Sequence, residues 1–259
     1  MNMITLLKKL LKSNKILKKI HIITYLITFS LSTSVYSEVI LKVEIHQTNS
    51  VISYETPPRL SQLLQDSYKL LDYRPYTLGS ALINKDKNLE IEKGALLSTL
   101  KTKNENELIN LYSIIKKIDF RYKENLTLDL EKIQLSHNLN PKLKGSYELH
   151  LPKRPKYIFI IDPIRSRKII KTKVQAGYDL TKYLKNYHQK SNNKSIFNDK
   201  TTIIQADKTI TNKESSYWNN KKYYLSPGSI IYFDINKNIE KASEINASLI
   251  SLLQHQVDF

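Results

Sequence analysis

The stretch that decides the fold is residues 143–155, LKGSYELHLPKRP. Its apolar residues Tyr147, Leu149 and Leu151 alternate with other residues, and this period of two predicts a β-strand with one buried face. Two prolines follow within residues 152–155, and proline cannot donate a hydrogen bond to a strand ladder. We therefore predict a strand that ends at these prolines and a boundary between two structural units.

The chain repeats one order of elements on the two sides of this boundary. Each side opens with two alternating segments that predict a β-hairpin, and a short helix follows. The hairpins are predicted at residues 38–46 with 51–55 and at 157–161 with 168–174, and the helices begin near Leu60 and after the capping residue Asp179. Further strands are predicted at residues 76–83, 126–133, 201–205, 208–211 and 229–235. This ββαββ order, found twice, predicts an α+β fold of two β-grasp units.

Two other parts of the chain carry a helical period. Residues 88–119 have apolar side chains at steps of three and four on both sides of a polar KTKN turn, which predicts a helical hairpin inserted in the first unit. Residues 236–259 predict a C-terminal amphipathic helix. Its apolar stripe buries either against the protein's own sheets or against a partner or membrane surface. The predicted domains are residues 38–152 and 153–235, followed by this helix.

The N-terminus has the pattern of a secretory signal. Residues 1–20 contain six lysines and no acidic residue, and a short apolar stretch and small polar residues follow. This order predicts a cleavable signal peptide over residues 1–37, cut between Ser37 and Glu38. The alternative is an uncleaved anchor, but the apolar core is shorter than the roughly 20 residues that span a bilayer. We expect an exported mature chain with no transmembrane segment.

The charge balance is basic, with a formal net charge of +17. Removal of the six signal lysines leaves about +11, which still favours polyanionic partners. The lysines are spread along the chain and form no dense stripe interleaved with aromatic residues, as nucleic-acid binders have. We therefore expect no nucleic-acid partner and interpret most of this charge as general composition. The chain also lacks cysteine, so its stability must come from a hydrophobic core.

No motif for catalysis or metal binding is present in the sequence. The six histidines lack metal-ligand spacing, no GxSxG or phosphate-binding glycine loop occurs, and a cysteine nucleophile is excluded. Distant acidic residues can still assemble into a catalytic pair, so missing motifs do not exclude an enzyme. We expect no enzymatic activity, no cofactor and no bound metal.

A binding role is better supported by the rare residue types. Arginine is scarce beside lysine, and its planar fork pairs with carboxylates or sugar hydroxyls, which makes Arg154 a candidate. The single tryptophan, Trp218, is a candidate for stacking on a sugar face. The alternative for Trp218 and the tyrosines near it is ordinary core and loop packing.

Several segments together resemble the GfcC-type capsule biosynthesis proteins of Gram-negative bacteria. Residues 143–155 are similar to that family's L-x-G-x-Y-x-L-x-L-P-x-R-P signature. Residues 57–60, PPRL, resemble its early turn, and residues 227–232, PGSIIY, resemble its late strand. Residues 252–255, LLQH, close the terminal helix in the family's manner. These matches occur in the expected order across most of the mature chain.

The resemblance implies two β-grasp domains related to the SLBB-like domains of outer-membrane polysaccharide export channels. It also implies a soluble periplasmic protein without catalysis that acts in capsule or exopolysaccharide assembly. Its partners would be a polysaccharide, an acidic one suiting the basic chain best, and the export machinery. The family's prominent arginine after the helical hairpin corresponds to Arg121 here. The alternative function is a periplasmic hydrolase or ligase that acts on the polymer.

Overall fold

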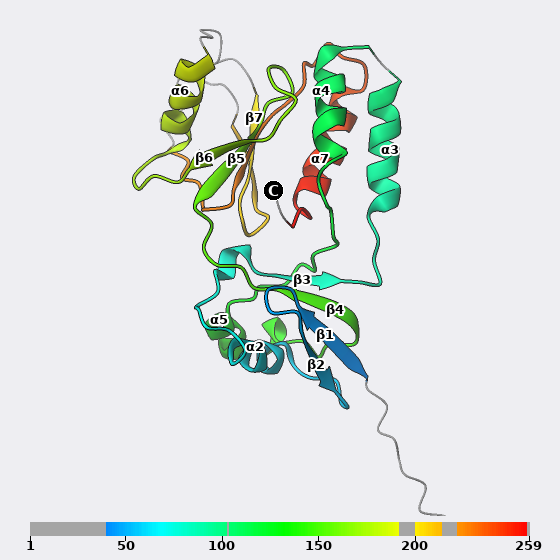
Figure 1. Ribbon diagram of the computed structural model, residues 1–259, viewed down its shortest axis with the longest axis vertical. Helices are drawn as coiled ribbons and strands as arrows, with labels where there is room; N and C mark the ends of the chain where they lie inside the picture. The colour runs from blue at the N-terminus through cyan, green and yellow to red at the C-terminus, as the bar shows by residue number, and fades with distance from the viewer. Residues whose placement is uncertain (1–39, 103, 192–199, 214–221, 258–259) are drawn as a thin grey trace, which may run out of the picture. The chain divides into compact units, whose positions relative to one another are not determined.

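A computed structural model describes residues 40–102, 104–191, 200–213 and 222–257 (Figure 1). The predicted signal peptide and its cleavage site, Ser37 and Glu38, lie outside these residues, as does Trp218. Within the described ranges, no helix combines the length and apolar character needed to cross a membrane. The described residues between Ile40 and Val257 form one compact unit.

The first sheet has four strands in the order β2-β1-β4-β3. These are β1 (Leu41–Ile45), β2 (Ser50–Tyr54), β3 (Ala81–Asn84) and β4 (Gly145–His150). The hairpin strands β1 and β2 are antiparallel, the central pair β1 and β4 is parallel, and β3 runs antiparallel to β4. A parallel central pair that joins the first and last strands is the order of a β-grasp sheet.

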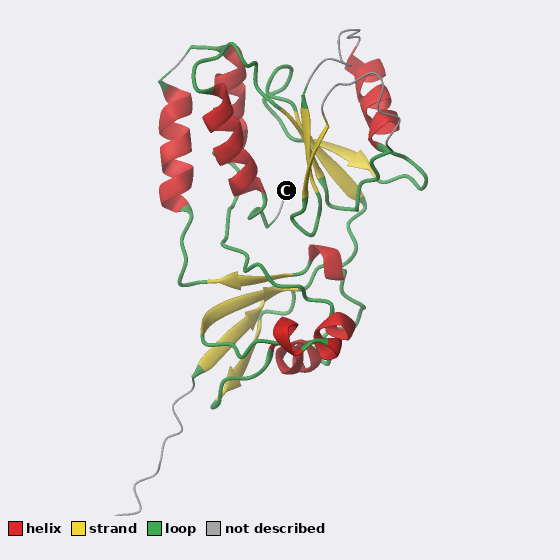
Figure 2. Cartoon of the chain, turned by 180° about the vertical axis from the view of Figure 1, so that it is seen from behind, coloured by secondary structure: helices red, strands yellow, loops and turns green. Residues whose placement is uncertain are grey.

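One face of this sheet is buried beneath two helices, α2 (Leu60–Tyr68) and α5 (Leu130–Leu135), as Figure 2 shows. Leu41 and Val43 point to this core because alternate residues of a strand share one face. Leu63 and Leu64 of α2 meet them there. The opposite face of β1 and β4 carries charged and histidine side chains.

The second sheet has five strands in the order β6-β5-β9-β7-β8. These are β5 (Tyr157–Ile161), β6 (Ile170–Lys173), β7 (Thr201–Ile204), β8 (Ile210–Lys213) and β9 (Ile230–Phe233). The hairpin strands are again antiparallel, and β5 is parallel to β9 as β1 is to β4. The α+β class with two sheets is therefore confirmed, and the repeated element order is a repeat of topology.

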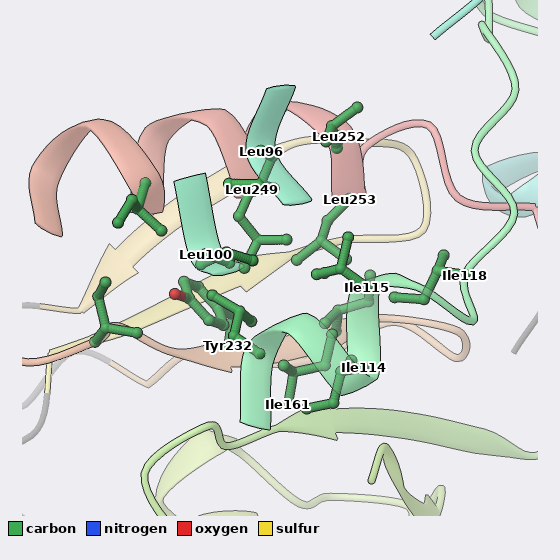
Figure 3. Close-up of a cluster of buried hydrophobic side chains, with 14 of the residues drawn as sticks. Leu96, Leu100, Ile114, Ile115, Ile118, Ile161, Tyr232, Leu249, Leu252 and Leu253 are labelled. Carbon is green, nitrogen blue, oxygen red and sulfur yellow. The ribbon is translucent and has the colours of Figure 1, made fainter. Parts of the chain in front are cut away.

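Helices cover both faces of the second sheet. In β9, Ile231 and Phe233 pack under α6 (Leu180–Ser191), whereas Ile230 and Tyr232 face the other core. That other core is built by α3 (Glu90–Lys101), α4 (Asn106–Ile115) and α7 (Ala242–Leu253), whose side chains converge on Tyr232 in Figure 3. Asp179 caps α6 as predicted, since its Oδ1 accepts a hydrogen bond from the Lys182 amide at 3.0 Å.

The predicted helical hairpin is present as α3 and α4, between β3 and β4 in the chain. It buries its apolar side chains against the second sheet, beside Ile161 and Tyr232. The terminal helix α7 also packs in this core, through Ala242, Ile245 and three leucines. Of the two alternatives for its apolar stripe, the structure thus shows burial against the protein's own sheet.

Three expected elements differ in the structure. The strand predicted at residues 76–83 begins only at Ala81, because a 3₁₀ turn occupies Thr77–Gly79. The strand predicted at residues 126–133 is wrong: Asp129 accepts a hydrogen bond from the Lys132 amide at 3.3 Å and caps α5 instead. The terminal helix begins at Ala242, after Lys241 takes a left-handed conformation with φ of 61°.

Candidate functional site

The outer face of the first sheet carries a polar cluster around β1 and β4. Because β1 and β4 are parallel and in register, Glu44 lies beside Glu148. The chain then places His46, just after β1, within 2.6 Å of Glu148, measured from Nδ1 to Oε1. His150 lies two residues beyond Glu148 on the same face and is buried.

Arg121 reaches this cluster from the segment that follows α4. Its Nη1 donates to both carboxylate oxygens of Glu148 at 2.7 and 2.8 Å, and its Nε donates to Asp119 Oδ2 at 2.8 Å. The Glu148 side chain is only 12% exposed, and its carboxylate oxygens are in contact with Arg121 and His46. We name His46, Arg121, Glu148 and His150 the arginine–histidine cluster.

His150 is held in its neutral form by its surroundings. Burial lowers its pKa to about 3, and the positive groups of Lys123, His46 and Arg121 act in the same direction. Its Nδ1 lies 3.0 Å from Gln47 Nε2, an amide nitrogen that can only donate, so Nδ1 is the acceptor. His150 therefore carries its proton on Nε2 and stays uncharged near pH 7.

A half-buried histidine, His255, joins the same segment to the residues that follow α7. His255 Nδ1 accepts a hydrogen bond from the Lys123 amide at 3.0 Å, and its ring stacks on Tyr122 with centroids 4.9 Å apart. Burial lowers the pKa of His255 to about 4, with Lys208 and Lys123 adding to the effect. The Arg121 amide donates to the His255 carbonyl at 3.0 Å. The segment after α4 is thus fixed both to β4 and to the chain end.

The two described site residues that were predicted from the sequence, Arg121 and Arg154, do not belong to one site. Arg121 lies at the centre of the arginine–histidine cluster, whereas Arg154 is exposed and shares no hydrogen bond or ion pair with it among the described residues. His46, Glu148 and His150 were not among the site residues predicted from the sequence. A signal for two of them was present, because Glu148 and His150 are the polar positions of the alternating segment 143–155.

The geometry limits what the cluster can do chemically. Two carboxylates already compensate the Arg121 charge, so its attraction for an anionic polymer is weakened. One guanidinium nitrogen, Nη2, makes no hydrogen bond within the described part of the chain and can donate to a sugar oxygen. No group of three or more metal-ligating side chains occurs among the residues that the structure describes.

Replacing Arg121 with Ala is expected to lower the free energy of unfolding by about 1–2 kcal/mol, because Glu148 loses a charged donor in a half-buried site. Arg121→Lys should recover part of this loss, since lysine keeps the charge without the fork. Urea denaturation measures both values. Arg154→Ala is the matched control and should change stability by less than about 0.5 kcal/mol, as is usual for an exposed side chain. Equal losses for Arg121→Ala and Arg154→Ala would contradict the assigned geometry.

Comparison with known proteins gives one family. Residues 168–258, from just before β6 through α7, match the family model described as capsule biosynthesis GfcC C-terminal. No curated protein matches the chain. The matched part contains α6, strands β6 to β9 and the terminal helix, and the resemblance noted in the sequence is thereby confirmed over these residues. Over residues 168–258 the chain is therefore similar to the C-terminal part of the GfcC capsule biosynthesis proteins, and this match points to a role in capsule biosynthesis.

Proposed function

We propose that this protein is a non-catalytic accessory of capsule assembly and export that works in the periplasm and contacts the polysaccharide, the export channel or both. The observation that carries the proposal is the match of residues 168–258 to a capsule biosynthesis family. The signal-like pattern of residues 1–37 supports export to the periplasm.

The chemistry of the arginine–histidine cluster and of His255 near it supports a non-catalytic role. A general acid or base works best when its pKa lies near the working pH. The pKa of His150 is about 3 and that of His255 about 4, so both rings are uncharged and poor proton donors near neutrality. Glu148 accepts hydrogen bonds from Arg121 and lies in contact with His46. Its carboxylate oxygens therefore already have partners within the protein.

Deletion of the gene tests the accessory role. We expect surface capsule to fall several-fold while cytoplasmic polymer precursors stay at their normal level, and plasmid-borne wild-type protein should restore the capsule. Unchanged surface polymer in the deletion strain would overturn the proposal. Fractionation adds a second test: the protein should appear in the periplasmic extract with an intact mass that begins at Glu38.

The enzyme alternative has its own measurement. Purified protein is incubated with purified capsular polysaccharide, and the chain-length distribution is followed by size-exclusion chromatography. An accessory protein leaves the distribution unchanged. A progressive shift to shorter or longer chains would establish a hydrolase or ligase and contradict the non-catalytic assignment.

A further inference from the structure

A cavity of about 820 Å³ opens beside β9 and α7, away from the arginine–histidine cluster. Polar side chains from β7, β8 and the residues just after β9 line one part of it, and residues of α7 between Ala242 and Ile250 line another. We call it the β9–α7 cavity. Its volume lies within the roughly 300–1,000 Å³ typical of small-ligand pockets.

Asn246 of α7 presents a fixed amide donor at this cavity. Its Oδ1 accepts hydrogen bonds from the Tyr232 hydroxyl at 2.6 Å and from the Ile235 amide at 3.2 Å. A backbone N–H can only donate, so the atom at that position is the oxygen and the amide orientation is determined. The Asn246 Nδ2 group makes no hydrogen bond within the described part of the chain, and it belongs to a residue that lines the cavity.

A neighbouring group of side chains has one acceptor oxygen too many. Thr202 Oγ1 lies 3.1 Å from Asn212 Oδ1 and 3.1 Å from Asp234 Oδ1, but a hydroxyl has a single hydrogen to donate. If the Asn212 amide is turned over, its nitrogen donates to Thr202 and its oxygen is left without a donor. In the turned-over orientation, the oxygen without a protein donor belongs to the exposed Asn212 side chain, and it can accept a hydrogen bond from a ligand at the cavity wall.

The charges at the cavity are balanced. Lys200 Nζ lies 3.6 Å from Asp234 Oδ2, and burial raises the pKa of Asp234 above its ordinary value, with the Thr202 hydrogen bond opposing the shift. The Glu107 carboxylate accepts the Asn236 amide at 2.8 Å. With Lys237, the lining holds two lysines and two carboxylates, so neither sign of ligand charge is favoured.

We propose that the β9–α7 cavity binds an uncharged sugar residue of the polysaccharide, an inference that rests on the proposed capsule function. A sugar hydroxyl both donates and accepts, so one ring can donate to the acceptor oxygen beside Thr202 and accept from Asn246 Nδ2. Ile164, Ile235 and Ile250 line the same space and fit the apolar C–H face of a pyranose.

Two tryptophan substitutions on α7 test this assignment. Ser243 and Ser248 are both exposed, but Ser243 lines the β9–α7 cavity and Ser248 lines a separate groove beside α3. The probe is a set of oligosaccharides prepared by partial hydrolysis of the strain's own capsular polysaccharide. Calorimetric titration should show binding to the wild-type protein, at least tenfold weaker binding to Ser243→Trp, and no more than a twofold change for Ser248→Trp.

A third variant tests the polar contact at the cavity wall, and a second probe tests whether the bound sugar is uncharged. Asn212→Ala removes an exposed side chain whose amide faces Thr202, and it should weaken binding severalfold without blocking the cavity. Carboxyl-reduced oligosaccharides, in which any uronic acid has become a neutral sugar, should bind as tightly as the untreated ones. All variants should keep the wild-type thermal midpoint within about 2 °C.

Three outcomes overturn the inference. They are absence of binding to the wild-type protein, unchanged binding to Ser243→Trp, and loss of binding on carboxyl reduction. The capsule phenotype of the deletion strain is independent of these results. A deletion that lowers surface capsule while a Ser243→Trp allele restores it fully would leave the accessory role standing and refute the cavity alone.

Discussion

Acidification from pH 7 to pH 4 is expected to lower the free energy of unfolding by about 3 kcal/mol through His150 alone. Folding lowers the pKa of His150 from its ordinary value of 6.5 to about 3. Between these values the unfolded chain binds the proton and the folded chain does not. The stabilisation is therefore fully present above pH 6.5 and is lost as the pH falls toward 3.

The substitution His150→Asn removes the pH-dependent contribution of His150 to stability, while it keeps a hydrogen-bond acceptor near Gln47 Nε2. We expect the variant to be less stable at pH 7 but to lose clearly less stability on acidification than the wild type does. Urea denaturation at half-unit pH steps measures the difference. His255, whose pKa is about 4, acts in the same direction and leaves a residual slope in the variant.

The exposed His137 provides the control. His137→Asn makes the same exchange at a ring that lies at the surface in contact with Arg59, and its curve is compared with that of His150→Asn. A His150→Asn curve parallel to the wild-type curve would show that His150 titrates normally in the folded protein. That result would contradict its burial beside Lys123 and Arg121.

Local sequence patterns were sufficient for most elements of the fold. The hairpin of β1 and β2, the capped helix α6 and the helical hairpin each have a period or a cap of their own, and all appear in the structure. The prediction for residues 126–133 was wrong because Leu126 and Leu128 alternate as in a strand, whereas Asp129 caps a helix. The alternating period predicted a strand and the capping residue predicted a helix, and the structure has the helix.

Long-range packing was beyond the reach of these patterns. An apolar helix face indicates that the helix is buried, but it does not indicate which sheet covers it. The packing of α3 and α4 on β5 and β9 is therefore known only from the structure. The candidate site has the same origin. His46 and Glu148 are 102 residues apart and meet because β1 and β4 are parallel and in register.

Truncation of Leu249 to Ala is expected to lower the free energy of unfolding by about 2–5 kcal/mol, the largest effect of any single substitution proposed for this protein. Leu249 is fully buried in α7, and Figure 3 draws it in one cluster with Leu100 and Tyr232. Removal of its branched methyl groups loses the free energy gained by burying them. It also leaves a cavity that the surrounding three helices and sheet cannot close.

The same measurement decides whether α7 stays packed in solution. Ser248→Ala changes the neighbouring exposed residue and should alter stability by less than about 0.5 kcal/mol. A helix that left this core to dock on a partner or membrane surface would contribute little to folding, and Leu249→Ala would then cost less than about 1 kcal/mol. A loss within the expected range, with an unchanged urea m-value, ties α7 to the core formed by α3, α4, β5 and β9.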